Sequence, residues 1–251
     1  RPFCCYAAWT PPHDEWVIPD NAPFSDKPWP VEMKNYAAMV ALADKDVGRL
    51  MQKLKELGIA DNTLVMFSSD NGANKECVEQ LGSTGGLRGY KRLLYEGGIR
   101  APLIASWPSK IQPGTTSDLK TTFVDFLPTA ADVIGAPAPS STDGISILPT
   151  LLGKEQSKLH EALYFEIYEP HFQQSARLGD WKGYRLGTKA PLELGSGLTQ
   201  GRFAIHLEVP GQVDYGKQQV AQLIGDCCLI ACGHGLEHFI QLFTHLVQHR
   251  Q

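Results

Sequence analysis

Two short apolar runs enclose a glycine-rich loop between residues 63 and 107, and this stretch constrains the fold more than any other part of the chain. The first run ends abruptly in Ser69-Asp70-Asn71-Gly72, and the second run is Ala101–Ser106. The loop between them is basic and contains Lys91. A strand that delivers a carboxylate and an amide at its end, followed by a positioned cation, suits a site for a hard metal ion and an anionic substrate.

The apolar pattern along the first 153 residues predicts an α/β fold. Val31–Leu57 places its apolar residues on one helical face, and Gly58 stands where a left-handed residue ends a helix. Pro2–Trp9, Thr63–Ser68 and Ala101–Ser106 have the character of buried strands. The order of strand, loop, helix and strand predicts a mostly parallel sheet flanked by helices.

The pattern changes after residue 153, and two further regions are expected. Short strands at Ala162–Ile167, Ser175–Leu178 and Lys182–Leu186 predict a small antiparallel α+β C-terminal subdomain over residues 154–194. Residues 195–251 form a divergent tail that opens with Gly195-Ser196-Gly197, a composition typical of a flexible junction. We expect this tail to be a non-homologous extension that is poorly integrated with the core.

The tail also carries the one other candidate metal site. His234 and His238 are four residues apart, with Cys227, Cys228 and Cys232 nearby. This spacing matches no standard zinc motif, so an amphipathic helix near 234–249 with histidines at its edge is the better interpretation.

Composition excludes several classes of partner. The net charge of -4 gives no basic footprint for nucleic acid. No apolar run reaches the roughly 18 residues that suggest a membrane span. The six cysteines fall mostly in adjacent pairs, which favours neither a disulfide framework nor a zinc site.

Three motifs carry a resemblance to a known family. They are Thr10-Pro11-Pro12-His13, Ser69-Asp70-Asn71-Gly72, and Arg88-Gly89-Tyr90-Lys91 followed by Glu96-Gly97-Gly98-Ile99-Arg100-Ala101-Pro102. In this order and spacing, residues 1–194 resemble the C-terminal half of the sulfatases, the formylglycine-dependent hydrolases of the alkaline-phosphatase-like superfamily. The resemblance implies an incomplete alkaline-phosphatase-like fold. It also implies a periplasmic, extracellular or lysosome-like compartment.

The resemblance implies a role for four residues. Asp70 and Asn71 would bind Ca²⁺, with Mg²⁺ as the alternative, since carboxylate and amide oxygens suit hard cations. Lys91 would hold the sulfate and its leaving oxygen. His13 would contact the sulfate and protonate the leaving group. The implied substrate is a small-molecule sulfate ester or a sulfated glycan.

The sequence departs from the family in two respects that matter for activity. It contains no Cys/Ser-x-Pro-x-Arg motif, which supplies the formylglycine nucleophile, and it lacks the first pair of metal-binding aspartates. Both would lie in an N-terminal half, so we expect the isolated chain to be inactive. Two alternatives stay open: a phosphoester or phosphonate hydrolase of the same superfamily, and a non-catalytic pseudoenzyme or binding fragment.

Each of these residues also has an ordinary interpretation without a catalytic role. Asp-Asn-Gly is ordinary turn chemistry, a lysine is usually solvated, and a lone histidine is usually a surface residue. Glu96 and Arg100 are predicted to be structural, pairing with or capping the loop. It is the joint occurrence of the motifs that favours the catalytic interpretation.

Overall fold

The computed structural model describes residues 2–22, 24–169, 171–186, 203–207 and 227–233. These residues form two four-stranded sheets. The first sheet has the order β1 (Cys4–Ala8), β8 (Cys227–Gly233), β2 (Thr63–Ser69) and β3 (Leu103–Ser106). The second has the order β4 (Leu163–Ile167), β5 (Gln173–Leu178), β6 (Trp181–Leu186) and β7 (Phe203–Leu207).

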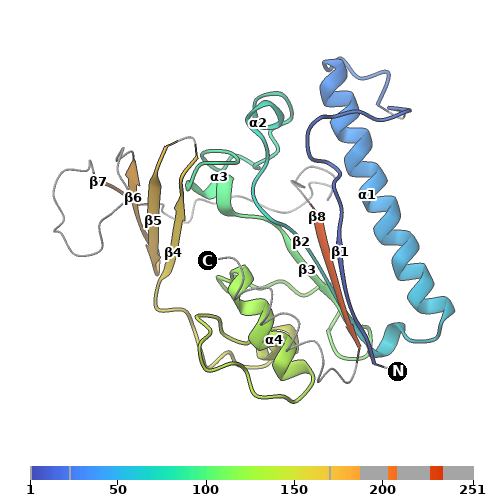
Figure 1. Ribbon diagram of the computed structural model, residues 1–251, viewed down its shortest axis with the longest axis vertical. Coiled ribbons are helices and arrows are strands. Elements are labelled where there is room, and N and C mark those ends of the chain that lie inside the picture. The colour runs from blue at the N-terminus through green and yellow to red at the C-terminus, as the bar shows by residue number, and fades with distance from the viewer. Residues whose placement is uncertain (1, 23, 170, 187–202, 208–226, 234–251) are drawn as a thin grey trace.

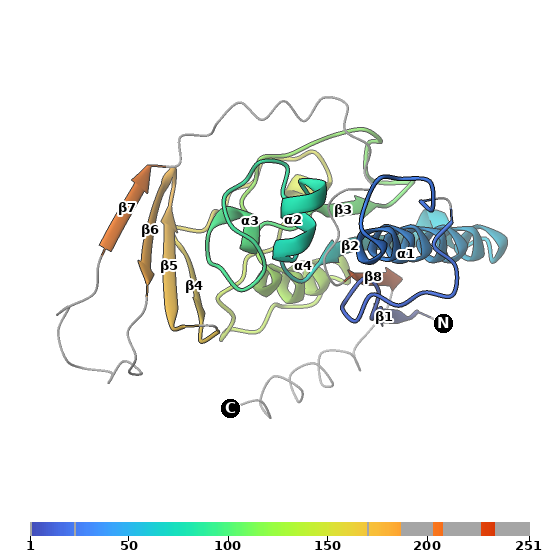
Figure 2. The same ribbon diagram turned by 90° about the horizontal axis from the view of Figure 1, so that it is seen from above.

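Two short helices lie between the two sheets. Both views place α2 (Lys75–Leu81) and α3 (Glu96–Ile99) there (Figure 1, Figure 2). The long helix α1 (Val31–Glu56) runs along the opposite side of the first sheet (Figure 1). The predicted helix over Val31–Leu57 is therefore confirmed, and Gly58 follows it in the left-handed conformation, with φ of 68°.

Helices cover both faces of the first sheet. Val65 of β2 packs with Leu54 of α1, whereas Leu64 and Met66 pack with Val133 on the other face. Val133 ends α4 (Phe126–Val133), which the short helix η2 (Phe123–Asp125) precedes. The alternation of side chains along a strand sends neighbouring residues to opposite faces, so β2 is buried on both. The prediction of a sheet flanked by helices agrees with this packing.

The prediction of a mostly parallel sheet is not confirmed. β8 pairs with both β1 and β2, and β2 pairs with β3, and all three pairings are antiparallel. β1 and β2 still run in the same direction, because each is antiparallel to the strand between them. The strand–helix–strand order predicts the relative direction of β1 and β2, but it cannot tell which strand lies between them.

The tail also differs from its expected behaviour. Its segments 203–207 and 227–233 are strands of the second and first sheets, and β8 occupies an interior position. The tail therefore contributes to both sheets, which a flexible appendage would not. The helix expected near 234–249, with His234 and His238, lies outside the described residues.

The second sheet matches the prediction of short antiparallel strands. All three of its strand pairs are antiparallel, and β5 and β6 meet at Gly179-Asp180, where Gly179 has φ of 56°. The domain boundaries at residues 153/154 and 194/195 stay predictions. Within the described ranges, no helix combines the length and apolar character needed to cross a membrane.

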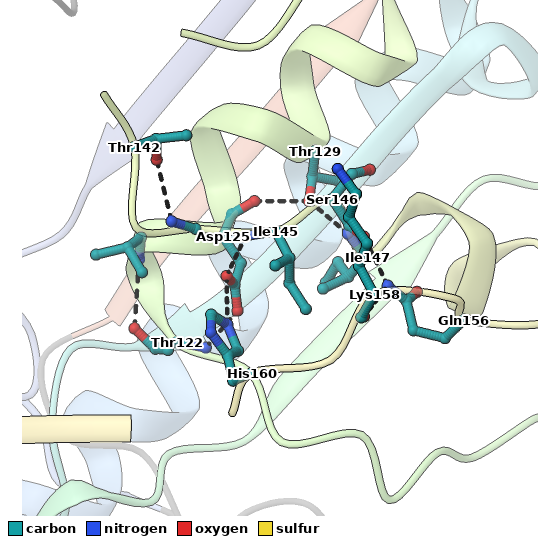
Figure 3. A network of polar contacts seen from close by, with 12 residues as sticks. Thr122, Asp125, Thr129, Thr142, Ile145, Ser146, Ile147, Gln156, Lys158 and His160 are labelled. Atoms are coloured by element: carbon teal, nitrogen blue, oxygen red, sulfur yellow. Dashed lines mark hydrogen bonds and ion pairs between the residues drawn. The ribbon is translucent and has the colours of Figure 1, made fainter. Parts of the chain in front are cut away.

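A buried carboxylate holds together several segments of the chain that connects the two sheets. Asp125, which is 1% exposed, accepts hydrogen bonds from the backbone N–H groups of Thr122 and Ile145, each at 2.8 Å. The ring Nε2 of His160 lies 2.7 Å from the same carboxylate (Figure 3). Thr129 then accepts from the N–H of Ile147 at 3.0 Å, next to the short helix α5 (Leu148–Leu151). A proline-rich segment is thus fixed to α4 by buried polar contacts.

Candidate functional site

The ends of β1 and β2 bring the predicted site residues to one edge of the first sheet. Ala8 and Ser68 both pair with Cys228, one on each side of β8. Because β1 and β2 run in the same direction, the chain leaves both strands at the same edge. The segment to His13 and the segment to Asp70 therefore start as neighbours.

Asp70 and Asn71 present oxygen atoms at this edge. Asp70 is exposed and Asn71 is half-buried. The hydroxyl of Ser69 donates to the backbone oxygen of Asn71 at 3.0 Å and fixes the turn. The side-chain Oδ1 of Asn71 is buried, and no hydrogen-bond donor reaches it within the described part of the chain. A buried acceptor without a donor is unusual and is suited to a cation.

The loop that carries Lys91 lies directly against the end of β2. The N–H of Lys91 donates to the carbonyl of Ala73 at 2.8 Å, and the N–H of Gly72 donates to Gly98 at 2.9 Å. The approach is so close that a Cβ on Gly72 would lie 1.9 Å from the carbonyl oxygen of Gly97. Glycine is therefore required at residue 72. The backbone of Lys91 is held at Ala73, which follows Asn71 by two positions in the sequence.

The contacts of His13 indicate its tautomer. The ring Nδ1 lies 2.7 Å from the carbonyl oxygen of Asp14 and 3.3 Å from its carboxylate. A carbonyl oxygen can only accept, so Nδ1 carries the proton in this contact. Proton exchange with a bound molecule then falls to Nε2.

Asp14 connects the His13 segment to the Lys91 loop. A backbone hydrogen bond, the charge of His13, a hydrogen bond from the Asn74 side chain and the charge of Lys91 together hold the pKa of Asp14 below its usual value, despite some desolvation. Asn74 precedes α2, yet its side chain does not cap that helix. Asp14 and Asn74 were not among the predicted site residues. Only the proximity of Asp14 to His13 in the sequence hinted at such a contact.

Glu96 ties the same loop to the second sheet. Its carboxylate accepts a hydrogen bond from Lys182 at 2.6 Å and lies 2.8 Å from the guanidinium of Arg177, while Arg100 is 3.9 Å away. Burial raises the pKa of Glu96, but the hydrogen bonds from Lys182 and Arg177 outweigh this effect and hold the pKa below its usual range. The predicted structural role of Glu96 agrees with this geometry, with partners that the sequence did not indicate.

The predicted residues thus gather at one edge. His13, Lys91 and the Asp70-Asn71 turn come from three separate segments, joined by the contacts of Asp14 and Ala73. An oxygen-rich turn beside a lysine and a histidine is an arrangement for a cation and an oxyanion. Among the described residues, however, no group of three or more His, Cys, Asp or Glu side chains forms a complete metal site.

Comparison with known proteins identifies the family. Residues 2–136 match the family model described as Sulfatase. The chain belongs to the sulfatase family. The sulfatase match contains all four predicted site residues.

Individual relatives agree with this assignment. The chain is 33% identical over 192 residues to the uncharacterized sulfatase YdeN of Escherichia coli, a match that covers 73% of this chain and 33% of that protein. It is 38% identical over 144 residues to human arylsulfatase A, which covers 56% of this chain and 28% of the relative. This sulfatase chain therefore spans about a third of the length of the curated relatives it matches.

Solved structures are similar as well. Ps i-CgsB in complex with k-i-k-neocarrahexaose aligns with a TM-score of 0.61 at 27% identity, covering 70% of this chain and 39% of that chain. A protein in complex with its substrate D-glucosamine-2-N,6-O-disulfate aligns with a TM-score of 0.55 at 28% identity, covering 70% of this chain and 33% of that chain. These likenesses assign the fold to the alkaline-phosphatase-like class.

Proposed function

We propose that this chain carries the sulfate-binding and metal-binding part of a calcium-dependent sulfatase that hydrolyses sulfate monoesters. The supporting observation is the convergence of Lys91, His13 and the buried, unpaired Oδ1 of Asn71 at one edge of the first sheet. Membership of the sulfatase family supports sulfate esters as the substrate class.

Each of the chain's own residues would have a defined task. The ammonium group of Lys91 would bind a sulfate oxygen, since a compact cation on a long stem suits a tetrahedral oxyanion. His13 would donate a proton from Nε2 to the leaving oxygen, because its Nδ1 is already directed at Asp14. Asp14 would hold the His13 ring by direct contact, and its negative charge would attract the Lys91 ammonium group.

Asp70 and Asn71 fit a hard cation in chemical type. One supplies a carboxylate, and the other supplies a buried amide oxygen without a donor. Calcium takes about 6–8 oxygen ligands, so these two residues would provide only part of its coordination. Mg²⁺ is the alternative. When bound, the ion would supply positive charge next to the sulfate oxygens.

Turnover is not expected from this chain alone. The sequence has no Cys/Ser-x-Pro-x-Arg motif, so none of its residues can be converted into the formylglycine that the family uses. We therefore propose that the chain binds Ca²⁺ weakly, binds sulfate, and does not hydrolyse aryl sulfates. The natural substrate would be an aryl sulfate or a sulfated sugar, the latter in keeping with the sugars bound by two similar structures.

A related activity is the alternative. A phosphonate monoester hydrolase from Silicibacter pomeroyi has the same fold, with a TM-score of 0.55 at 19% identity over 87% of this chain and 40% of that chain. At this identity the likeness concerns the fold alone. A phosphoester or phosphonate hydrolase would bind phosphate in preference to sulfate. The remaining alternative is a non-catalytic pseudoenzyme or binding fragment, which would bind a ligand without turning it over.

Calorimetry with inorganic sulfate, inorganic phosphate and Ca²⁺ tests the proposal. We expect Lys91→Met to weaken sulfate binding at least about tenfold, which is the loss of one charge-assisted hydrogen bond. The matched control Lys154→Met, at an exposed lysine of the connecting segment, should leave it unchanged. Asn71→Leu should abolish the effect of Ca²⁺ on sulfate affinity. Sulfate binding that is insensitive to Lys91→Met would refute the assignment, and a clear preference for phosphate would favour the alternative.

A further inference from the structure

The residue next to Lys91 has an unfavourable backbone conformation. Arg92 has φ of 75°, and it is the one non-glycine residue with positive φ among those that the structure describes. For an L-residue with a side chain, this left-handed region is unfavourable, because Cβ comes too close to a backbone carbonyl oxygen. Such a conformation persists only where the surroundings enforce it. Lys91 lies in the same turn, because the N–H of Leu93 donates to the carbonyl of Tyr90 at 3.0 Å and the turn so closed contains both residues.

The side chain of Gln173 contacts the backbone of this turn. Gln173 is the first residue of β5, it is 1% exposed, and it lies 81 positions from Arg92 in the sequence. Its Nε2 donates to the carbonyl of Arg92 at 2.8 Å, and its Oε1 accepts from the N–H of Leu94 at 3.4 Å. The amide therefore bridges the two backbone groups that flank Leu93.

The Gln173 amide is itself held in place. Its Nε2 also donates to the carbonyl of Glu169 at 3.2 Å, and the hydroxyl of Tyr184 donates to its Oε1. Tyr184 is 3% exposed and stacks on Tyr95 of the same loop, with ring centroids 4.2 Å apart. A buried amide with both ends hydrogen-bonded has one orientation, since any rotation would leave a buried polar group unsatisfied.

A second attachment holds the far end of the loop. Lys182 and Arg177, on β6 and β5, bind Glu96 as described above. The second sheet therefore contacts the Lys91 loop at Arg92, Leu94 and Tyr95 and again at Glu96.

We propose that Gln173 is a positioning residue for Lys91: by clamping Arg92 in the left-handed conformation, it fixes the direction of the Lys91 ammonium group toward the oxyanion. This inference rests on the proposed sulfate-binding role of Lys91. It assigns to the second sheet a functional task that its position outside the sulfatase motifs does not suggest. Without the clamp, Arg92 relaxes to a right-handed conformation and Lys91 loses its orientation, while the rest of the fold persists.

The test compares Gln173→Met with a matched control on the same strand. Methionine has a similar volume and shape but makes no equivalent hydrogen bonds. The control is Gln174→Met, because Gln174 is only half-buried and points to the opposite face, where it donates to the hydroxyl of Tyr164. Two quantities are measured on the full chain: amide hydrogen exchange of peptides covering residues 88–98, and the Kd for inorganic sulfate under conditions where the chain is folded.

We expect Gln173→Met to accelerate exchange in residues 88–98 by about tenfold or more and to weaken sulfate binding about tenfold, the scale of losing one to two buried hydrogen bonds. Gln174→Met should change neither quantity. If Gln173→Met does not fold, Tyr184→Phe replaces it, because this variant removes only the hydroxyl that holds Oε1. It should change both quantities in the same direction, by a smaller factor.

Each contrary result has a separate meaning. Unchanged exchange in residues 88–98 overturns the clamp. Faster exchange with an unchanged sulfate Kd, while Lys91→Met still weakens binding, overturns the positioning role and leaves Gln173 a structural residue. If the unsubstituted chain binds no sulfate, the proposed function fails, and the exchange measurement alone then decides whether Gln173 holds the loop.

Discussion

Neutralising Glu96 is expected to cost more stability than neutralising Lys182, although the two side chains form one pair. Both are buried, with side-chain exposures of 8% and 3%, and their charged atoms are 2.6 Å apart. Removing one partner of a buried ion pair costs about 3–5 kcal/mol, because it leaves a buried charge uncompensated. Glu96→Gln removes the carboxylate from both Lys182 and Arg177, so we expect a cost at the upper end of this range. Lys182→Met leaves Arg177 at 2.8 Å from Glu96, so we expect about 3 kcal/mol.

The double variant Glu96→Gln/Lys182→Met separates the pair from its surroundings. Replacing both charges with neutral groups of similar shape is often close to neutral, so the double variant should cost less than the sum of the two single variants. The measurement is urea unfolding followed by tryptophan fluorescence and circular dichroism. Glu56→Gln is the matched control, since Glu56 pairs with Lys53 at 3.2 Å on the exposed face of α1. It should change stability by less than about 1 kcal/mol.

Two results would refute this reasoning. Equal costs for the two single variants would mean that Arg177 does not share the carboxylate. A cost below about 1 kcal/mol for Glu96→Gln would mean that water reaches the cluster and screens the charges.

Three further outcomes are expected. Gly98→Ala should prevent folding or reduce stability by several kcal/mol, because its Cβ would lie 1.9 Å from a backbone carbonyl oxygen. Gly48→Ala, in the open middle of α1, should instead stabilise the chain by about 0.5–1 kcal/mol, and thermal unfolding compares the two variants. Burial raises the pKa of Cys77 to about 12, so mass mapping after maleimide treatment at pH 8 should find Cys5 modified and Cys77 intact until the chain is denatured. The lowered pKa of Glu96 contributes stability that is complete above its unfolded pKa of about 4.3 and is lost as the pH falls through the folded value. On acidification, the urea midpoint should therefore drop less steeply in Glu96→Gln than in the unsubstituted chain.

Local patterns predicted the local elements well. The amphipathic period and Gly58 defined α1 almost to the residue, and the apolar run at residues 63–68 defined β2. Pro128 lies inside the first turn of α4, where a missing N–H costs little, so it does not interrupt this helix.

Sheet topology was predictable only in part. The order of elements gave the common direction of β1 and β2, which is what brings His13 and Asp70 to one edge. It did not reveal β8 between them, because a strand from residues 227–233 leaves no signal in the first 70 residues. That insertion accounts for the antiparallel pairings of β8 with β1 and β2, whereas the antiparallel pairing of β2 with β3 does not involve β8.

The residues of the candidate site were also predictable only in part. The sequence motifs indicated His13, Asp70, Asn71 and Lys91. They did not indicate Gln173, because a glutamine in a strand next to a second glutamine looks solvent-facing. Its burial depends on which face of β5 meets the loop, and that is decided by packing between residues 81 positions apart.

The buried carboxylate of Asp125 has a consequence for engineering. The segment from 136 to 149, rich in proline and serine, has the composition of a permissive surface connection, where insertions and circular permutation are usually tolerated. Yet Ile145 and Ile147 have their N–H groups in the buried network of Asp125 and Thr129, and a Cβ on Gly144 would lie 2.0 Å from the carbonyl oxygen of Val124. A peptide tag inserted there would break these buried contacts. The exposed loop tip at Gly114, where a Cβ would meet nothing within 4 Å, is the safer place for a label.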